Sequence, residues 1–278
     1  MRLIKPSFEI LEQQPGILGL YKQIELAGRT CYKSEDKITE DSAKGFVDRM
    51  IKSGHGAMLE HGTVYLEVPC YESNFTDDIV ERYITNKYSI VRDKYEIITS
   101  IFQFDSTAYI TTNLRVLVEN GWTDDLKYIC EPTEYHEKRV TVRFICDRGV
   151  SHEFVRHRVF SFAQESTRYC NYSKDKFGNE LTFIQPLWLE DIDSNLDFKD
   201  CLQHSELAYF NLLDRGWKPQ QARAVLPNSL KTELVMTGFV SDWKHFFKLR
   251  DAGSAHPQAQ ELAKPLHGEF IRRNYVNE

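Results

Sequence analysis

The 278-residue sequence contains no run of about 18 apolar residues, so it offers no transmembrane helix. It has no tract rich in proline, glycine or serine that could act as a linker, and no internal repeat. After Arg2 and Lys5, the acidic Glu9 and Glu12 stand where a secretion signal needs an apolar core. We therefore expect one domain, 1–278, in the cytoplasm and without a membrane partner.

Cysteine is scattered, and the common dinucleotide motifs are absent. The six cysteines form no C-x-x-C pair, so neither a disulfide framework nor a clustered zinc site is indicated. His55, Glu60 and His61 lack the spacing of H-E-x-x-H and a third ligand, so we predict no metal site. Because no G-x-G-x-x-G motif or P-loop occurs, a dinucleotide would have to be held without a Rossmann-type fold.

The charge distribution points to a local anionic ligand. A net charge of −6 and a pI near 5.9 argue against a surface that binds nucleic acid as a whole. Within 139–176, however, eight Arg and Lys residues oppose four Asp and Glu residues. We interpret this segment as facing something anionic. A solvated basic face that pairs with the acidic remainder of the molecule is the alternative, and charge does not separate the two.

The hydrophobic pattern predicts an α+β fold with a central, mostly antiparallel sheet flanked by helices. Apolar and polar residues alternate over 63–68 and 140–146, as in half-buried strands, whereas the second half of the chain is mostly helical in pattern. The segment of about 70–139 is predicted to be an insertion, with a helix over 107–120. Nothing in it names a ligand.

The chemistry is concentrated after the strand at 140–146. A helix is predicted from Val150 to Arg158, with Ser151 as its N-cap. Residues two apart on a helix point about 200° from each other, so Arg156 and Arg158 would address different ligands, or one ligand and a neighbouring subunit. Guanidinium groups suit phosphate through bidentate hydrogen bonds. The run therefore predicts a dianionic nucleotide.

The same run resembles a known signature. Arg156-His157-Arg158, then seven residues, Ser166 and Arg168-Tyr169, is similar to the motif of the flavin-dependent thymidylate synthases. Three flanking blocks fall in that family's order: Gly54-His55 with Leu59-Glu60-His61 and Thr63; Ala222-Arg223-Ala-Val-Leu-Pro227; and Phe246-Phe-Lys-Leu-Arg250 followed by His256-Pro-Gln258.

The resemblance implies an enzyme that makes dTMP from dUMP. The one-carbon unit would come from 5,10-methylenetetrahydrofolate, and the reducing equivalents from NADPH by way of bound FAD. It also implies a homotetramer with active sites between subunits. A non-catalytic protein that uses the basic segment 139–176 to bind nucleotide or RNA is the alternative function.

Carried over position by position, the resemblance also implies site residues. For dUMP these are Glu153, Arg156, Gln164, Ser166, Arg168, Arg223 and Arg250. For FAD they are His61, Thr63, Arg156, His157, Arg158, Gln164, Ser241 and His245. Arg250 matches the arginine credited with favouring ionisation at the uracil N3 and is the predicted catalytic residue.

A protein nucleophile is not expected. Cys70 follows Pro69, faintly like the Pro-Cys-His of cysteine-dependent thymidylate synthases, but Tyr71 replaces the histidine and Glu67 and Glu72 give no electropositive setting. Two departures from the family pattern are the length of the 70–139 insert and Ala163, where an asparagine is common.

Overall fold

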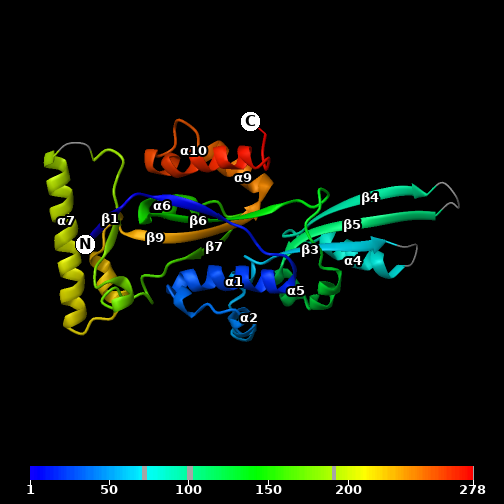
Figure 1. The fold of residues 1–278 in the computed structure, drawn as a ribbon, viewed down its shortest axis with the longest axis horizontal. Coiled ribbons are helices and arrows are strands. Elements are labelled where there is room, and N and C mark those ends of the chain that lie inside the picture. The colour runs from blue at the N-terminus through cyan, green and yellow to red at the C-terminus, as the bar shows by residue number, and fades with distance from the viewer. Residues whose placement is uncertain (71–73, 99–102, 190–191, 278) are drawn as a thin grey trace.

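The computed structural model describes residues 1–70, 74–98, 103–189 and 192–277. It confirms the predicted α+β class (Figure 1). The strands are β1 (Arg2–Ile4), β2 (Ser7–Leu11), β3 (Thr63–Cys70), β4 (Ile90–Ile98), β5 (Gln103–Asn113), β6 (Arg139–Asp147), β7 (Ser161–Gln164), β8 (Thr182–Ile184) and β9 (Lys231–Phe239). The helices are α1 (Gly16–Tyr32), α2 (Ser42–Lys52), α3 (Gly56–Leu59), α4 (Asn74–Ile84), α5 (Leu114–Asn120), α6 (Arg148–Phe154), α7 (Ile192–Asp214), α8 (Pro219–Ala222), α9 (Val240–Arg250) and α10 (Pro257–Arg272). In the described parts of the chain, we find no helix with the length and apolarity that a membrane span requires.

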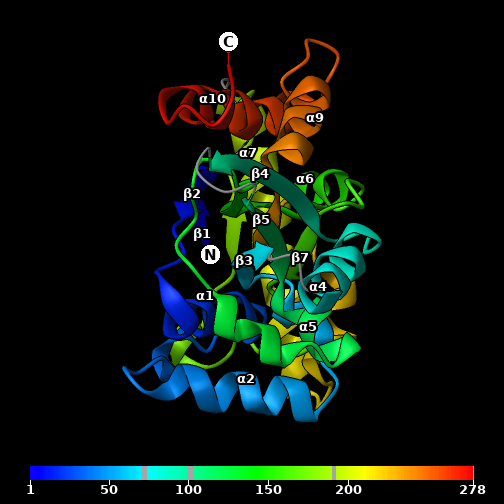
Figure 2. The ribbon, with the colours of Figure 1, turned by 90° about the vertical axis from the view of Figure 1, so that its right-hand side faces the viewer.

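The central sheet has the strand order β2-β6-β9-β7 and is antiparallel throughout. Seven consecutive residues of β9 are buried, because helices cover both faces of the sheet at this strand. Helices α9 and α10 lie on one face, and α1 with α2 lies on the other (Figures 1 and 2). Trp243 and Phe246 of α9 pack with Phe144 of β6 in the larger hydrophobic core. A separate pair, β1 and β8, is parallel and lies outside the antiparallel pattern.

A second antiparallel sheet, β3-β5-β4, forms an arm that extends away from the central sheet (Figure 1). The base of the arm shares a core with the N-terminal helices, in which Leu66 of β3 and Ile110 of β5 cluster with Ile24 of α1 and Val47 of α2. The predicted insert, 70–139, therefore supplies most of the arm, but it is packed against the N-terminal part of the chain.

Two expected helices have different bounds in the structure. The helix predicted over 107–120 begins only at Leu114, because 107–113 pair with β3 as the end of β5. The helix predicted over 150–158 is α6 and ends at Phe154. Its N-cap is Asp147 and not Ser151, which lies within the helix and donates to the carbonyl oxygen of Arg148.

Candidate functional site

A helix N-cap and an aromatic contact hold the segment after β6 in position. One carboxylate oxygen of the buried Asp147 accepts a hydrogen bond of 2.7 Å from the backbone nitrogen of Val150 and so starts α6. At the end of this helix, Phe154 packs edge-on against Phe144 and Phe246, each at 5.0 Å between ring centroids. The chain then leaves the helix, and the Arg-His-Arg tripeptide lies in a turn.

The turn separates the three residues of the tripeptide. Arg156 and Arg158 are exposed, whereas His157 is 7% exposed. The helical geometry assumed for the two arginines is therefore wrong, because α6 has already ended. Neither arginine forms an ion pair with any other described residue, so both guanidinium groups are available to an anion.

Arg250, at the C-terminus of α9, is held by three hydrogen bonds. Its Nη1 donates to Oε2 of Glu153 at 2.5 Å, and its Nη2 donates to the carbonyl oxygen of Glu153 at 2.8 Å. Its Nε donates to Nε2 of His157 at 3.0 Å. Because this nitrogen accepts, the histidine carries its proton on Nδ1. We call Arg250, Glu153, His157 and His245 the arginine cluster.

Within the arginine cluster, the imidazole of His157 is kept neutral. Burial, together with the positive charge of Arg250 and the nearby His245, lowers the pKa of His157 to about 4. The ring of the exposed His245 is 6.1 Å from that of His157. Ser241, one turn earlier on α9, is exposed. At neutral pH the cluster thus holds one fixed guanidinium beside one neutral hydrogen-bond acceptor.

A second group of predicted residues follows β7. The side-chain nitrogen of Gln164 donates to the hydroxyl oxygens of Ser151 (2.9 Å) and Thr232 (3.2 Å), which ties the end of β7 to α6 and β9. The backbone nitrogen of Ser166 donates to the carbonyl oxygen of Cys31, so the following loop rests on α1. These contacts fix the loop that carries the next arginine.

Two exposed arginines meet at this loop, and we call them the loop arginines. Nε of Arg168 donates to the side-chain oxygen of Gln220 at 3.2 Å, and Nη1 of Arg223 donates to the hydroxyl of Thr167 at 3.3 Å. The hydroxyl of Ser166 accepts from the backbone nitrogen of Arg168 at 3.3 Å. Within the described ranges, no ion pair neutralises either arginine, and no hydrogen bond joins them to the arginine cluster.

Two further predicted flavin residues, His61 just before β3 and Thr63 at its start, lie deeper. His61 is fully buried, and its Nδ1 is 2.8 Å from the hydroxyl oxygen of Thr237, which is itself hydrogen-bonded to Thr141. Burial and the nearby Arg139 lower the pKa of His61 to about 3, and its Nε2 has no hydrogen-bond partner. The buried Thr63 accepts from Nη1 of Arg139 at 3.4 Å. Their role in flavin binding stays a prediction.

A cavity of about 760 Å³ opens between the arm and the N-terminus of α9. Its lining includes Arg158, to which the resemblance assigns a flavin contact, and the aromatic side chains of Phe239 and Phe160. The guanidinium Nε of Arg139, which also lines it, is buried without a partner. The volume, aromatic walls and cations of this cavity fit a flavin dinucleotide, which is both aromatic and anionic.

The cavity also contains residues that sequence reasoning missed. Lys87, Tyr88 and Arg115 of the predicted insert line it together with Arg158. No motif in the sequence marks them, because their place in the cavity depends on where the arm lies in the folded chain.

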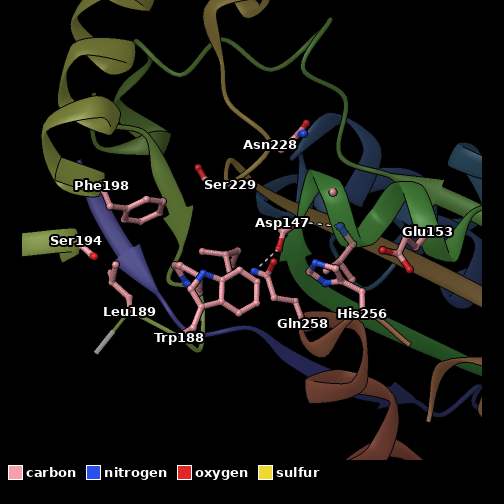
Figure 3. A pocket seen from close by; sticks show the side chains of 14 residues that line it. Asp147, Glu153, Trp188, Leu189, Ser194, Phe198, Asn228, Ser229, His256 and Gln258 are labelled. Carbon is pink, nitrogen blue, oxygen red and sulfur yellow. Dashed lines mark hydrogen bonds between the residues drawn. The ribbon is translucent and has the colours of Figure 1, made fainter. Parts of the chain in front are cut away.

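A different cavity, of about 560 Å³, lies at the start of α6 (Figure 3). Its polar side holds Asp147, whose Oδ2 accepts a 2.9 Å hydrogen bond from Gln258, and Glu153; its other side holds Trp188 and Phe198. Burial raises the pKa of Asp147. Two carboxyl groups make this cavity poorly suited to a dianion, so the basic surfaces described above are better candidates for the nucleotide phosphate.

Comparison with known proteins agrees with the motif. The family model described as thymidylate synthase complementing protein matches residues 132–273, just over half of the chain. The chain belongs to this family. The match contains the arginine cluster and the loop arginines, so the expected family membership is confirmed.

Individual relatives match over a similar region. The flavin-dependent thymidylate synthase of Pyrococcus furiosus is 30% identical over 132 residues, which are 47% of this chain and 53% of that protein. That of Thermococcus kodakarensis is 33% identical over 130 residues, 46% of this chain and 52% of that protein. The chain thus spans about half the length of the curated relatives it matches.

One solved structure is similar over nearly the whole chain. It is a UMP/dUMP methylase, PolB from Streptomyces cacaoi, bound with 5-Br dUMP. The TM-score is 0.46 at 16% identity, over 98% of this chain and 93% of that chain. A likeness at this level supports no inference about the present site.

Proposed function

We propose that this protein is an FAD-dependent thymidylate synthase, which methylates dUMP to dTMP at the expense of 5,10-methylenetetrahydrofolate and NADPH. The observation that carries the proposal is the arginine cluster, in which a guanidinium is held by three hydrogen bonds beside a neutral imidazole, inside the segment that matches the family. When bound, the flavin supplies the reducing equivalents for the methylation.

Arg250 supplies the electrostatic part of the reaction. A uracil becomes nucleophilic at C5 only if negative charge can develop over N3 and its carbonyl groups. A permanently charged guanidinium next to N3 stabilises that charge, and one well-placed donor of this kind typically contributes about 3 kcal/mol. The contacts to Glu153 and His157 fix the direction of the guanidinium before the nucleotide arrives.

The state of the thiols supports a reaction without a protein nucleophile. Burial raises the pKa of Cys31 and Cys130 to about 11 and that of Cys170 to about 12, and it raises the pKa of Cys146 further. These four groups are therefore uncharged thiols at neutral pH, and only a thiolate is an effective nucleophile. Cys70 is partly buried at the end of β3.

The exposed arginines support a nucleoside monophosphate as substrate. Arg168 and Arg223 lie on neighbouring segments joined through Thr167 and Gln220, and their charges are not neutralised by described carboxylates. Guanidinium groups bind phosphate oxygens through charge-assisted hydrogen bonds. We assign the phosphate of dUMP to these two residues.

We also propose a cytoplasmic homotetramer. The lack of any hydrogen bond between the loop arginines and the arginine cluster, among the described residues, is consistent with a site that combines the arginine cluster of one subunit with the loop arginines of another. Light scattering of the purified protein would report the mass. A monomer that retains full activity would contradict this arrangement.

The reaction itself is tested by tritium release from 5-labelled dUMP. Release and dTMP formation are expected only with FAD and NADPH present, and dTMP formation also requires the folate. The purified protein is expected to be yellow, with an absorbance that NADPH bleaches without oxygen. A colourless protein that takes up no added FAD and releases no tritium would favour the nucleotide- or RNA-binding alternative.

A further inference from the structure

We propose that the turn between α4 and β4 belongs to the flavin site, and that Lys87 in this turn contacts the phosphate groups of FAD. The inference rests on the proposed function and assigns a role to part of the predicted insert. It begins from the 760 Å³ cavity, because Asn86, Lys87 and Tyr88 line that cavity together with Arg158 and Phe239.

The turn is held in place by its own hydrogen bonds. The side-chain oxygen of Asn86 accepts from the backbone nitrogen of Tyr88 at 2.9 Å and from the hydroxyl of Ser89 at 3.2 Å. The hydroxyl oxygen of Ser89 also lies 2.8 Å from that of Thr112 on β5, from which it can accept. Lys87 therefore extends from a fixed backbone, which reduces the entropy lost when its ammonium group binds a ligand.

The preceding helix is anchored as well. The hydroxyl of Tyr83, near the end of α4, donates to the carboxylate of the buried Asp125 at 2.7 Å, and Arg82 pairs with the same carboxylate. Asp125 belongs to a short 3-10 helix, η2 (Thr123–Tyr128), which contacts β3. The position of Lys87 at the cavity is therefore set by packed elements on both sides of the turn.

The charges of the cavity single out this lysine. Four cationic and three acidic side chains line it. Arg115 is already paired with Glu60 at 2.5 Å and with Glu119 at 2.7 Å, so its charge is compensated. Lys87, Arg158 and Arg139 form no ion pair with any residue that the structure describes, but Arg139 donates to the carbonyl oxygen of Glu60, whereas Lys87 and Arg158 are exposed. The ammonium of Lys87 lies over the ring of Tyr88, 4.8 Å from its centroid.

Two exposed cations without an ion-pair partner among the described residues, beside aromatic side chains, favour a ligand that has anionic and aromatic parts. The pyrophosphate of FAD supplies the charge, and its two ring systems suit the walls of Phe160, Phe239 and Tyr88. NADPH and a folate are also anionic, so the test uses flavins alone.

The test compares flavin binding by Lys87→Ala and by a matched control. Lys127→Ala is the control, because Lys127 lies 4.9 Å from the ring centroid of Tyr128 on the same insert but outside the cavity. Affinities for FAD and for riboflavin, which has no phosphate, would be measured by fluorescence titration without substrate. We expect Lys87→Ala to bind FAD about tenfold more weakly, as for the loss of one charge-assisted hydrogen bond. Riboflavin binding should not change.

Each result decides a different point. Unchanged FAD affinity in Lys87→Ala, or equal losses for FAD and riboflavin, would overturn the phosphate contact while the proposed function stands. A loss of the same size in Lys127→Ala would show a general effect of charge and also overturn it. If the unmodified protein binds neither flavin, the proposed function fails, and the inference fails with it. Lys87→Arg should retain FAD affinity close to that of the unmodified protein.

Discussion

Replacing Arg250 with glutamine tests the centre of the proposed mechanism. Glutamine keeps a polar side chain but removes the charge that would stabilise the developing negative charge on uracil. If that charge contributes about 3 kcal/mol, kcat should fall by roughly 10²-fold. FAD affinity should change much less, because Arg250 does not line the cavity that we assign to the flavin.

The same replacement has a second, independent readout. Arg250 is one of the causes that lower the pKa of His157 to about 4, next to the larger effect of burial. In Arg250→Gln the pKa of His157 should therefore rise, although burial will keep it below the ordinary value for histidine. Nuclear magnetic resonance of histidine-labelled protein over a pH series would measure it.

The cost to folding should be modest by comparison. The variant loses three hydrogen bonds, but the side chains of Arg250 and Glu153 are 16% and 25% exposed, so water can replace part of what is lost. We expect a loss of about 1 to 2 kcal/mol in the free energy of unfolding, measured with urea. Arg143→Gln is the control for a lost surface arginine, because Arg143 on β6 forms an ion pair with Glu9 on β2. Activity of Arg250→Gln within tenfold of the unmodified enzyme would refute the assigned role.

Three further predictions concern the thiols, the histidines and the cavity wall. Cys70→Ala should leave dTMP formation from labelled dUMP largely intact. A complete loss of dTMP formation in this variant would instead support a cysteine nucleophile. Because the pKa of His157 is lowered, the unfolded chain binds its proton first, so stability from this group is present above about pH 6.5 and is lost as the pH falls towards 4. Urea titrations would measure the free energy of unfolding at pH 7 and at pH 4.5. Its fall between these pH values should be about 2 kcal/mol smaller in His157→Gln than in the unmodified protein, and equal falls would count against the neutral imidazole. Gly238→Ala puts a Cβ 2.5 Å from the ring of Phe160, so unfolding should become about 1 to 3 kcal/mol easier and FAD binding weaker, whereas unchanged thermal unfolding would show that the ring moves freely.

The sequence predicted the central strands better than the helix ends. The apolar alternation of β6 depends only on local pattern, and the strand appears where it was expected. The helix after it ends four residues early, because the contact of Phe154 with Phe246 is formed by residues far apart in the chain. A local signal did exist for α5, since Asn113 accepts from the backbone nitrogen of Val116 as an N-cap and marks the true start of that helix.

The candidate site could be predicted from the sequence only through its motif. Arg250 lies 97 positions from Glu153 and 93 from His157, and no periodicity brings these residues together. The family resemblance named all three, while their mutual hydrogen bonds depend on the packing of α9 against α6 and β6. No sequence motif marks Lys87, so its place in the cavity wall is seen only in the folded structure.

The arm can contribute to a precise site because its base is part of the main body. Ile110 and Leu66 of the arm share a core with Ile24 of α1, and α1 in turn packs against β7 and β9. The two sides of the large cavity are thus linked through buried contacts. A binding group on a rigid element keeps its geometry when the ligand is absent. An insertion packed in this way can therefore add a cofactor contact to a family site without disturbing the residues that carry the family motif.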